Sequence, residues 1–144
     1  MRFMILVKAT KDSEAGVMPG EKLMADMATF HGELMKAGVL LDANGLQSSA
    51  KGFKFSGNKR TIFDGSFTET KEVVAGYTII QVKSRQEALD WARRMPNPAV
   101  DGKEGEIEIR QLFELEDFGP SEAVDRFREM GIAAKNSPPR IPIL

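Results

Sequence analysis

Cysteine is absent from the 144-residue chain, and histidine occurs once, as His31. Without cysteine the chain forms no disulfide and no thiolate metal site, which agrees with a reducing cytoplasm. One imidazole leaves only carboxylates to build a metal centre, and no acidic cluster has the spacing of a calcium loop. The glycines do not have the spacing of a phosphate loop or a dinucleotide-binding turn. The sequence therefore predicts a cytoplasmic protein with no metal and no bound cofactor.

The chain also lacks an excess of charge of either sign. Its 20 basic and 21 acidic residues give a net charge of -1, which creates no field that would attract nucleic acid or anionic lipid. No apolar run approaches the length of a membrane-spanning helix, and the short run after Arg2 fits a strand better than a signal peptide. We therefore expect neither a nucleic-acid partner nor a membrane partner.

The residues that are present predict one domain with a substantial core, since 42% are hydrophobic and 28% charged. Residues 2–9 alternate as a strand whose two faces are both apolar. Residues 21–38 carry apolar side chains at helical spacing, and Gly38 is placed to end that helix. Further strands are expected at 39–47, 73–82 and 105–115, a hairpin at 53–63, helices at 85–95 and 121–131, and an extended tail at 136–144.

This order predicts an α+β fold, a ferredoxin-like sandwich with an inserted hairpin. We assign residues 1–119 to that domain and residues 120–144 to a C-terminal helix and extended tail. Two helices can cover only one face of a four-stranded sheet, whereas the first strand is apolar on both faces. The second face is expected to meet another copy of the chain in a sheet-to-sheet homodimer. The apolar tail is expected to edge the same interface, since an extended segment needs a groove to bury its side chains.

The segment "DGSFTETKEVVAGYTIIQV", residues 64–82, resembles the signature of the YCII-related domain family, also called the DGPF family. The resemblance extends from "MRFMILVKAT" to "EIRQLFELEDFG", most of the chain. It implies a ferredoxin-like fold that dimerises as an α/β barrel, with a cleft suspected of binding or transforming a small molecule. The family as a whole has no established activity. Ser66 stands where the family has proline, so the turn here should be less rigid.

His31 shares its helical stripe with Met27, Leu34 and Met35, so it is expected to point at the sheet. One interpretation is a core histidine satisfied by a backbone carbonyl. The other pairs His31 with Asp64 across the cleft, where the carboxylate would fix the tautomer and make the imidazole a general base. The resemblance also implies such a pair. We therefore name His31 and Asp64 as the candidate catalytic residues.

The polar stretch after Asp64 is long enough to lie over a cleft, although a solvated turn is the simpler interpretation. Within it, Phe67 is a candidate for apolar contact with a ligand, and Glu69 and Lys71 are candidates for polar contact. Arg110 would hold a substrate carboxylate or pair with a neighbouring glutamate. The eight methionines are expected to fill the core.

Three functions remain open from the sequence. The first is a cofactor-independent enzyme that transfers protons on a small polar organic molecule. The second is a dimer that binds a small molecule without chemistry in the same cleft. The third is a regulatory interaction module in which the C-terminal tail grips a partner.

Overall fold

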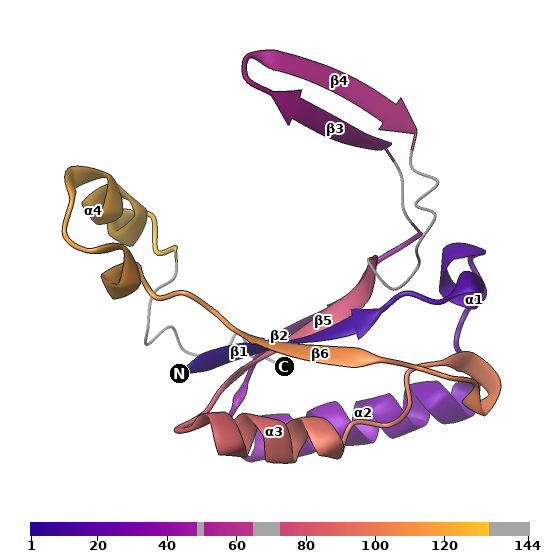
Figure 1. Cartoon of the computed structure of the whole chain (residues 1–144). Helices are drawn as coiled ribbons and strands as arrows, with labels where there is room; N and C mark the ends of the chain where they lie inside the picture. The colour runs from indigo at the N-terminus through magenta and orange to yellow at the C-terminus, as the bar shows by residue number, and fades with distance from the viewer. Residues whose placement is uncertain (49–50, 65–72, 133–144) are drawn as a thin grey trace.

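The computed structural model describes residues 1–48, 51–64 and 73–132 of the chain, and the side chain of Asp64 lies outside the description. The chain forms a four-stranded sheet, a separate two-stranded hairpin and helices (Figure 1). The strands are β1 (Arg2–Lys8), β2 (Leu40–Gly45), β3 (Lys51–Ser56), β4 (Lys59–Asp64), β5 (Val74–Gln81) and β6 (Ile107–Gln111). The helices are α1 (Lys11–Glu14), α2 (Glu21–Lys36), α3 (Arg85–Arg93) and α4 (Glu122–Glu129), with single 3₁₀ segments η2 (Val100–Gly102) and η3 (Leu115–Phe118).

The main sheet has the strand order β2-β5-β1-β6, and every neighbouring pair is antiparallel. The chain passes from β1 through α2 to β2, and later from β5 through α3 to β6, so two βαβ units are interleaved. Strands β3 and β4 form the hairpin between these units. The α+β prediction, with its four-stranded sheet and inserted hairpin, is confirmed.

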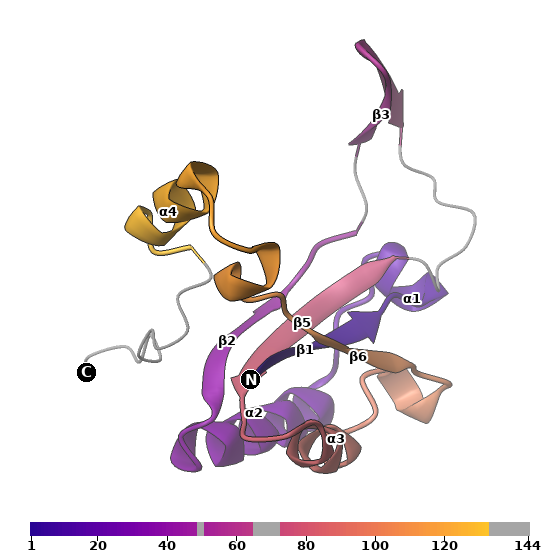
Figure 2. The ribbon, with the colours of Figure 1, turned by 60° about the vertical axis from the view of Figure 1, so that its left-hand side comes forward.

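One face of the sheet, here called the inner face, packs against α2 and α3, which lie side by side beneath it (Figure 2). Successive strand residues point to opposite faces, so Phe3 and Ile5 of β1 point inward and are fully buried. Leu34 of α2 and Ile80 of β5 join them in the core. This cluster holds both helices against the sheet because it removes their apolar stripes from water.

Local signals fix where the two long helices end or begin. The Ser84 hydroxyl accepts a hydrogen bond from the Glu87 amide, and the Glu87 carboxylate accepts one from the Lys83 amide, so α3 begins where the capping residues predict. Gly38 has φ of +75° just after α2, a conformation that glycine adopts without strain. Both helices begin at the predicted residues and end two residues before the predicted ends at 38 and 95.

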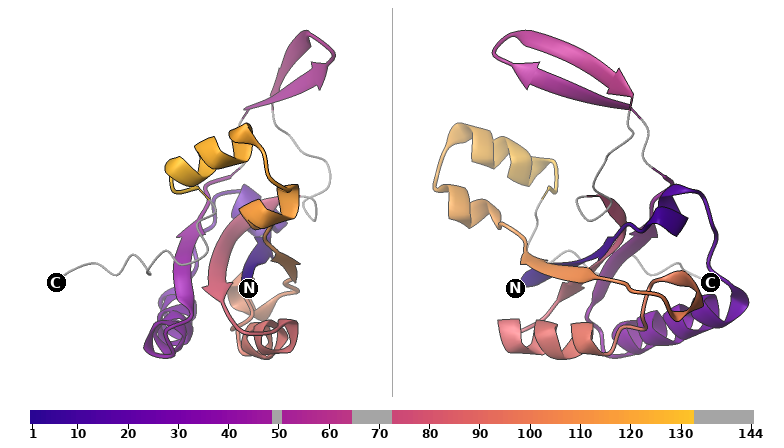
Figure 3. Two further views of the ribbon diagram at one scale, coloured as in Figure 1. Left: turned by 90° about the vertical axis from the view of Figure 1, so that its left-hand side faces the viewer. Right: turned by 45° about the vertical axis from the view of Figure 1, so that its right-hand side comes forward.

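Among the described residues, no helix covers the other face of the sheet, here called the outer face. Met4 and Leu6 of β1 point to it, next to Tyr77 and Ile79 of β5, and all four are partly buried. The hairpin and α4 both rise on this side, at opposite ends of the sheet (Figures 1 and 3). In the described part of the chain, the outer face is therefore apolar, lies between the hairpin and α4, and is open to solvent.

Several sequence expectations differ from the structure. The short helix α1 and the segment η3 were not predicted, and β6 ends at Gln111 rather than continuing to residue 115. Met35 is 49% exposed, so it does not belong to the sheet-facing stripe of α2. The expected tail at 136–144 lies outside the described residues. Across the part of the chain that the structure describes, helices are too short or too polar to cross a membrane.

Candidate functional site

A pocket of about 910 Å³ lies at one end of the inner face. It lies between the first half of α2, the segment that connects α1 to α2, and the adjoining ends of β2 and β5. Its apolar lining comes mainly from Val7, Val17, Met18, Leu23, Met24, Met27, Leu46, Met95, Pro98 and Val100. This volume lies toward the upper end of the range for small-molecule sites.

The polar groups of the pocket are uncharged amides, hydroxyls and one imidazole. They belong to Thr10, Ser13, His31, Gln47, Ser48 and Thr78. Asn44 and Tyr77 also line the pocket, but their polar side-chain atoms bond to each other on the outer face. Among the described residues, no lysine, arginine, aspartate or glutamate lines this pocket. An ionised ligand group would therefore lose its hydration without gaining a charged partner among the described lining residues. This transfer costs free energy.

His31 lies on the α2 wall of the pocket and points at the sheet, as its helical position predicts. Its Nδ1 atom is 2.8 Å from the carbonyl oxygen of Met27, one turn earlier in α2. Its Nε2 atom is 2.8 Å from Oγ1 of Thr78 on β5. The ring also meets Phe30 edge-on, with 5.4 Å between ring centroids. Contacts from two elements thus fix the imidazole in one orientation.

The partners of His31 decide which ring nitrogen carries a proton. A carbonyl oxygen only accepts hydrogen bonds, so Nδ1 must be protonated to donate to Met27. In the neutral ring Nε2 then accepts the proton of the Thr78 hydroxyl. Thr78 is 3% exposed, and its oxygen keeps lone pairs that can accept a further hydrogen bond. The pair therefore offers a fixed polar group on an otherwise apolar wall.

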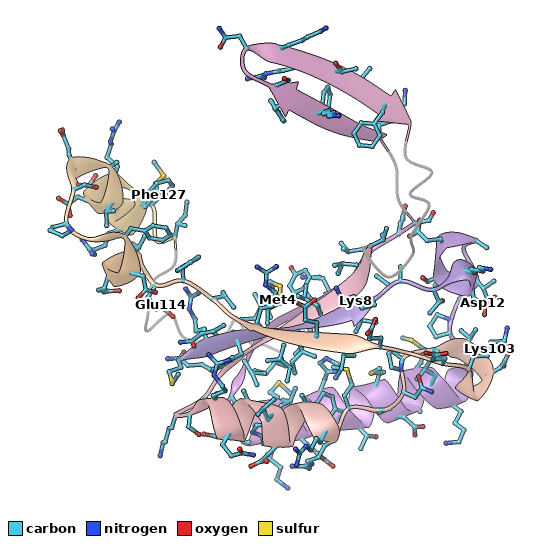
Figure 4. The ribbon with its side chains drawn as sticks, in the orientation of Figure 1. Met4, Lys8, Asp12, Lys103, Glu114 and Phe127 are labelled. Atoms are coloured by element: carbon cyan, nitrogen blue, oxygen red, sulfur yellow. The ribbon has the colours of Figure 1, made fainter. Side chains whose placement is uncertain are left out.

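The strands behind the pocket are joined by side chains as well as by backbone. The Tyr77 hydroxyl donates to a carboxylate oxygen of Asp42 at 3.2 Å and accepts a hydrogen bond from the Asn44 amide at 2.9 Å. These contacts connect β5 to β2 on the outer face, on the opposite side of the sheet from the pocket. Outside the pocket lining, Lys103 forms an ion pair with Asp12 of α1 at 3.0 Å (Figure 4). The hydrogen bond to Asp12 raises the pKa of Lys103 above its ordinary value.

The structure leaves the predicted pair of His31 and Asp64 untested. Asp64 is the last residue of β4, where its backbone pairs with Lys51, but its side chain is not described. Both ring nitrogens of His31 already have the partners given above, so a bond to Asp64 would require one partner to exchange. Phe67, Glu69 and Lys71 lie outside the described residues, and their predicted contacts with a ligand stay predictions.

Arg110 lies on the outer face of β6, opposite Met4 of β1, and is not among the residues that line the pocket. Its neighbour Glu108 forms an ion pair with Lys8 at 2.7 Å. The hydrogen bond and the charge of Lys8, together with the charge of Arg110, hold the pKa of Glu108 below its ordinary value. Both interpretations of Arg110, as the partner of a glutamate and as an anion clamp, stay predictions.

Two features of the pocket were missed from the sequence. Thr78 stands between inward-pointing apolar residues of β5, and a polar residue at such a position needs a partner, which is a signal that the sequence contains. The methionines were expected to fill the core, yet Met18 is 80% and Met24 53% exposed, and both line the pocket. Flexible thioether side chains suit a wall that adapts to different apolar ligands.

Comparison with known proteins places this fold and pocket in a family. The model of the YCII-related domain matches residues 1–116, from β1 into η3. An uncharacterised protein of Rhizobium meliloti is 32% identical over 94 residues, which cover 64% of this chain and 74% of that protein. The match includes the strands and helices that build the pocket, together with His31 and Thr78. The chain belongs to the YCII-related domain family.

Proposed function

We propose that this protein is a homodimer that binds a small, uncharged and largely apolar organic molecule in the pocket between α2, β2 and β5. The observation that carries the proposal is the pocket itself, with an apolar lining and the fixed His31–Thr78 pair on its wall. The sequence favoured a polar ligand, but the absence of charged groups among the described lining residues favours a neutral one. No metal or cofactor enters the proposal.

The polar group of the ligand has a defined place in this proposal. A ligand hydroxyl or amide N–H would donate to Oγ1 of Thr78, whose own proton is directed to Nε2 of His31. The rest of the ligand would lie against methionine and leucine side chains, where apolar burial supplies most of the affinity. One hydrogen bond made inside an apolar site adds specificity because a ligand lacking the donor leaves the acceptor unsatisfied.

A matched pair of probes tests this arrangement. 2-Naphthol and naphthalene are neutral and differ by one hydroxyl, and the fluorescence of both allows titration. We expect naphthol to bind roughly 2- to 10-fold more tightly, the value of one hydrogen bond. The preference should vanish in the double variant His31→Leu/Thr78→Val and persist in Thr29→Val, where the substituted threonine bonds only to its own helix. Equal binding of both probes to the native protein would contradict the proposed polar contact.

The position of the site needs a separate test. Ala28 lines the pocket, whereas Ala25 on the same helix does not. The variant Ala28→Trp should therefore abolish binding of both probes by filling the space, and Ala25→Trp should leave it unchanged. If both tryptophan variants bind naphthalene like the native protein, the probes occupy another part of the molecule and the proposal is wrong.

Proton-transfer catalysis is a second candidate function, supported by the geometry of His31. The Met27 carbonyl holds the tautomer in which Nε2 has the lone pair, the form that a general base requires. For catalysis, the Thr78 hydroxyl would turn away and a ligand C–H group would take its place. The predicted carboxylate of Asp64 would add basicity if it reached the ring.

Deuterium exchange distinguishes this enzyme from a simple binding protein. In D₂O, Nε2 of His31 would take a proton from the carbon next to the carbonyl of 2-indanone, and solvent would return a deuteron to that carbon. NMR should show faster exchange with the native protein than with His31→Leu, and Asp64→Asn should slow it if the pair forms. Equal rates with native protein and His31→Leu would leave binding as the function.

The homodimer is supported by the composition of the outer face. Met4, Leu6, Tyr77 and Ile79 form an apolar centre that the described part of the chain leaves open. Large exposed apolar patches mark interaction sites, and twofold pairing of identical faces is the commonest way to cover one. Light scattering at micromolar concentration should give twice the 15.9 kDa chain mass. A mass that stays at 15.9 kDa at high concentration would contradict the dimer.

A further inference from the structure

We propose that the β3–β4 hairpin of each chain docks on the C-terminal arm of a second copy, where the arm is defined as residues 115–130 and comprises η3 and α4. The inference rests on the proposed homodimer and adds the contact that fixes its orientation. It starts from the hairpin, which stands apart from the main sheet (Figure 1). A two-stranded hairpin alone is only marginally stable in water, so its strands need a further packing surface.

One face of the hairpin is apolar and exposed. Phe53 pairs with Ile62 across the strands, and Phe55 follows two residues later on the same face. Their exposed fractions are 61% for Phe53, 63% for Phe55 and 56% for Ile62. The Arg60 guanidinium lies 5.0 Å from the centre of the Phe55 ring on this face. Three large apolar side chains and one cation thus form a patch that no described element of the chain covers.

The C-terminal arm presents a second apolar patch. Phe127 and Met130 are 47% and 67% exposed, and with Ala123 and Arg126 they line a hollow of about 210 Å³ on α4. Phe127 is labelled in Figure 4. The hollow is smaller than most small-molecule sites, so it fits an apolar side chain better than a free ligand. An aromatic ring of the hairpin is an apolar side chain of the kind that fits this hollow.

The two patches carry opposite charge, although the whole chain is nearly neutral. The hairpin has four basic residues (Lys51, Lys54, Lys59 and Arg60) against one acidic residue, Asp64. The arm has five acidic residues (Glu116, Asp117, Glu122, Asp125 and Glu129) against two arginines. Glu122 and Glu129 are seven positions apart, so they share a row of α4 beside the hollow. Complementary charge around apolar centres is what orients two protein surfaces.

Twofold symmetry makes the contact possible twice in one dimer. The hairpin and α4 stand at opposite ends of the outer face, and both rise on its solvent side (Figure 3). Two chains can pair their outer faces about a twofold axis that is perpendicular to the plane of Figure 1. This axis reverses the second chain end to end, so the hairpin of each chain lies beside the arm of the other. An axis in the plane of that view would place hairpin beside hairpin, basic against basic. Charge repulsion disfavours that second arrangement.

Cross-linking tests the contact while the large apolar side chains of both patches are kept. The chain has no cysteine, so Ser56→Cys in the hairpin and Ala123→Cys in the arm provide two defined thiols through small substitutions. A bis-maleimide reagent should join chains of the double variant into covalent dimers. It should not join chains of either single variant at the same concentration, because the proposed symmetry brings unlike positions together.

The outcomes separate this inference from the dimer itself. If light scattering gives a dimer and no interchain cross-link forms, or if the link forms within one chain, the docking of hairpin on arm is wrong and the dimer stands. A monomer by light scattering contradicts the dimer and the docking together. Circular dichroism of each variant shows whether the fold is retained.

Charge reversal provides a second, independent readout. Lys54→Glu/Arg60→Glu in the hairpin, or Glu122→Lys/Glu129→Lys in the arm, should each raise the dimer dissociation constant at least 10-fold. Joining all four substitutions in one chain should restore most of the affinity. Lys22→Glu/Lys36→Glu on the exposed side of α2 is the matched control and should change nothing. If the variant with all four substitutions dissociates as readily as either double variant, the proposed charge pairing of hairpin and arm is wrong.

Discussion

The two faces of the sheet are built by the same strands, yet the helices of residues 1–48, 51–64 and 73–132 cover only one of them. On the inner face Phe3, Ile5 and Ile80 are fully buried beneath α2 and α3. On the outer face Met4 and Ile79, the direct sequence neighbours of such core residues, are only partly buried. The inner face supplies a core and the pocket within one chain. The outer face has the composition of a core without the element that would complete it.

The largest expected loss of stability is on the inner face, at Ile80 of β5. Ile80→Ala should lower the free energy of unfolding by roughly 2–5 kcal/mol, since it leaves a cavity in a fully buried cluster. This loss should be the same at every protein concentration, because the inner face is covered by its own chain. Chemical denaturation at two concentrations measures it. A loss below about 1 kcal/mol would mean that the core can collapse around the cavity.

The next largest loss of stability is expected at the ion pair that connects β1 to Glu114, the residue just before the arm. Arg2 bonds Glu114 through two 3.0 Å contacts, and their side chains are only 13% and 11% exposed. Arg2→Met should cost about 2–3 kcal/mol because it leaves a mostly buried carboxylate without its partner. Replacing both, as Arg2→Met/Glu114→Leu, should recover much of the loss.

Lys22→Met is the matched control for this pair. Lys22 also pairs with a carboxylate, that of Asp26, but its side chain is 91% exposed. Exposed pairs contribute at most about 1 kcal/mol, so this substitution should change the unfolding free energy little. Equal losses for Arg2→Met and Lys22→Met would show that burial does not decide the strength of these contacts.

The outer face responds differently if two copies meet there. Ile79→Ala should cost about 1 kcal/mol at low protein concentration, where a partly buried side chain of the single chain is shortened. At high concentration the cost should grow, because dimer formation stabilises the folded chain by mass action and the variant dimerises less well. Melting temperature measured over a 100-fold concentration range tests this. A concentration-independent cost would place Ile79 outside any interface.

Local and periodic signals predicted much of this architecture. The alternation in β1, the stripe of α2 and the cap at Ser84 depend on neighbouring residues, so their positions are visible in the sequence. The orientation of His31 toward the sheet was predicted for the same reason. Met35 was assigned to that stripe wrongly, because a position at the edge of a helical stripe is buried only if a neighbouring element reaches it.

The partner of His31 was beyond the reach of such signals. Thr78 is 47 positions away, and the contact depends on how α2 sits on β5 and on the register of the sheet. The uncharged pocket likewise arises from segments spread from Val7 to Val100. Long-range contacts of this kind have no sequence period. The predicted site around residues 64–71 depends on side chains that the structure does not describe, so it stays a prediction.

The smallest expected effect concerns protonation on the outer face. Lys8 holds the pKa of Glu108 below its ordinary value of 4.5, first through a hydrogen bond and then through its charge. A lowered pKa in the folded state means that the contact stabilises the fold above the ordinary pKa and loses this effect as pH falls through the folded value.

Lys8→Met should therefore raise the pKa of Glu108, as followed by NMR titration of its carboxyl carbon. The difference in stability between native protein and variant should shrink as pH falls below 4.5. Lys103→Met, which breaks the ion pair with Asp12 of α1, should leave the titration of Glu108 unchanged. An unchanged Glu108 pKa in Lys8→Met would show that Arg110 alone sets the charge balance of this face.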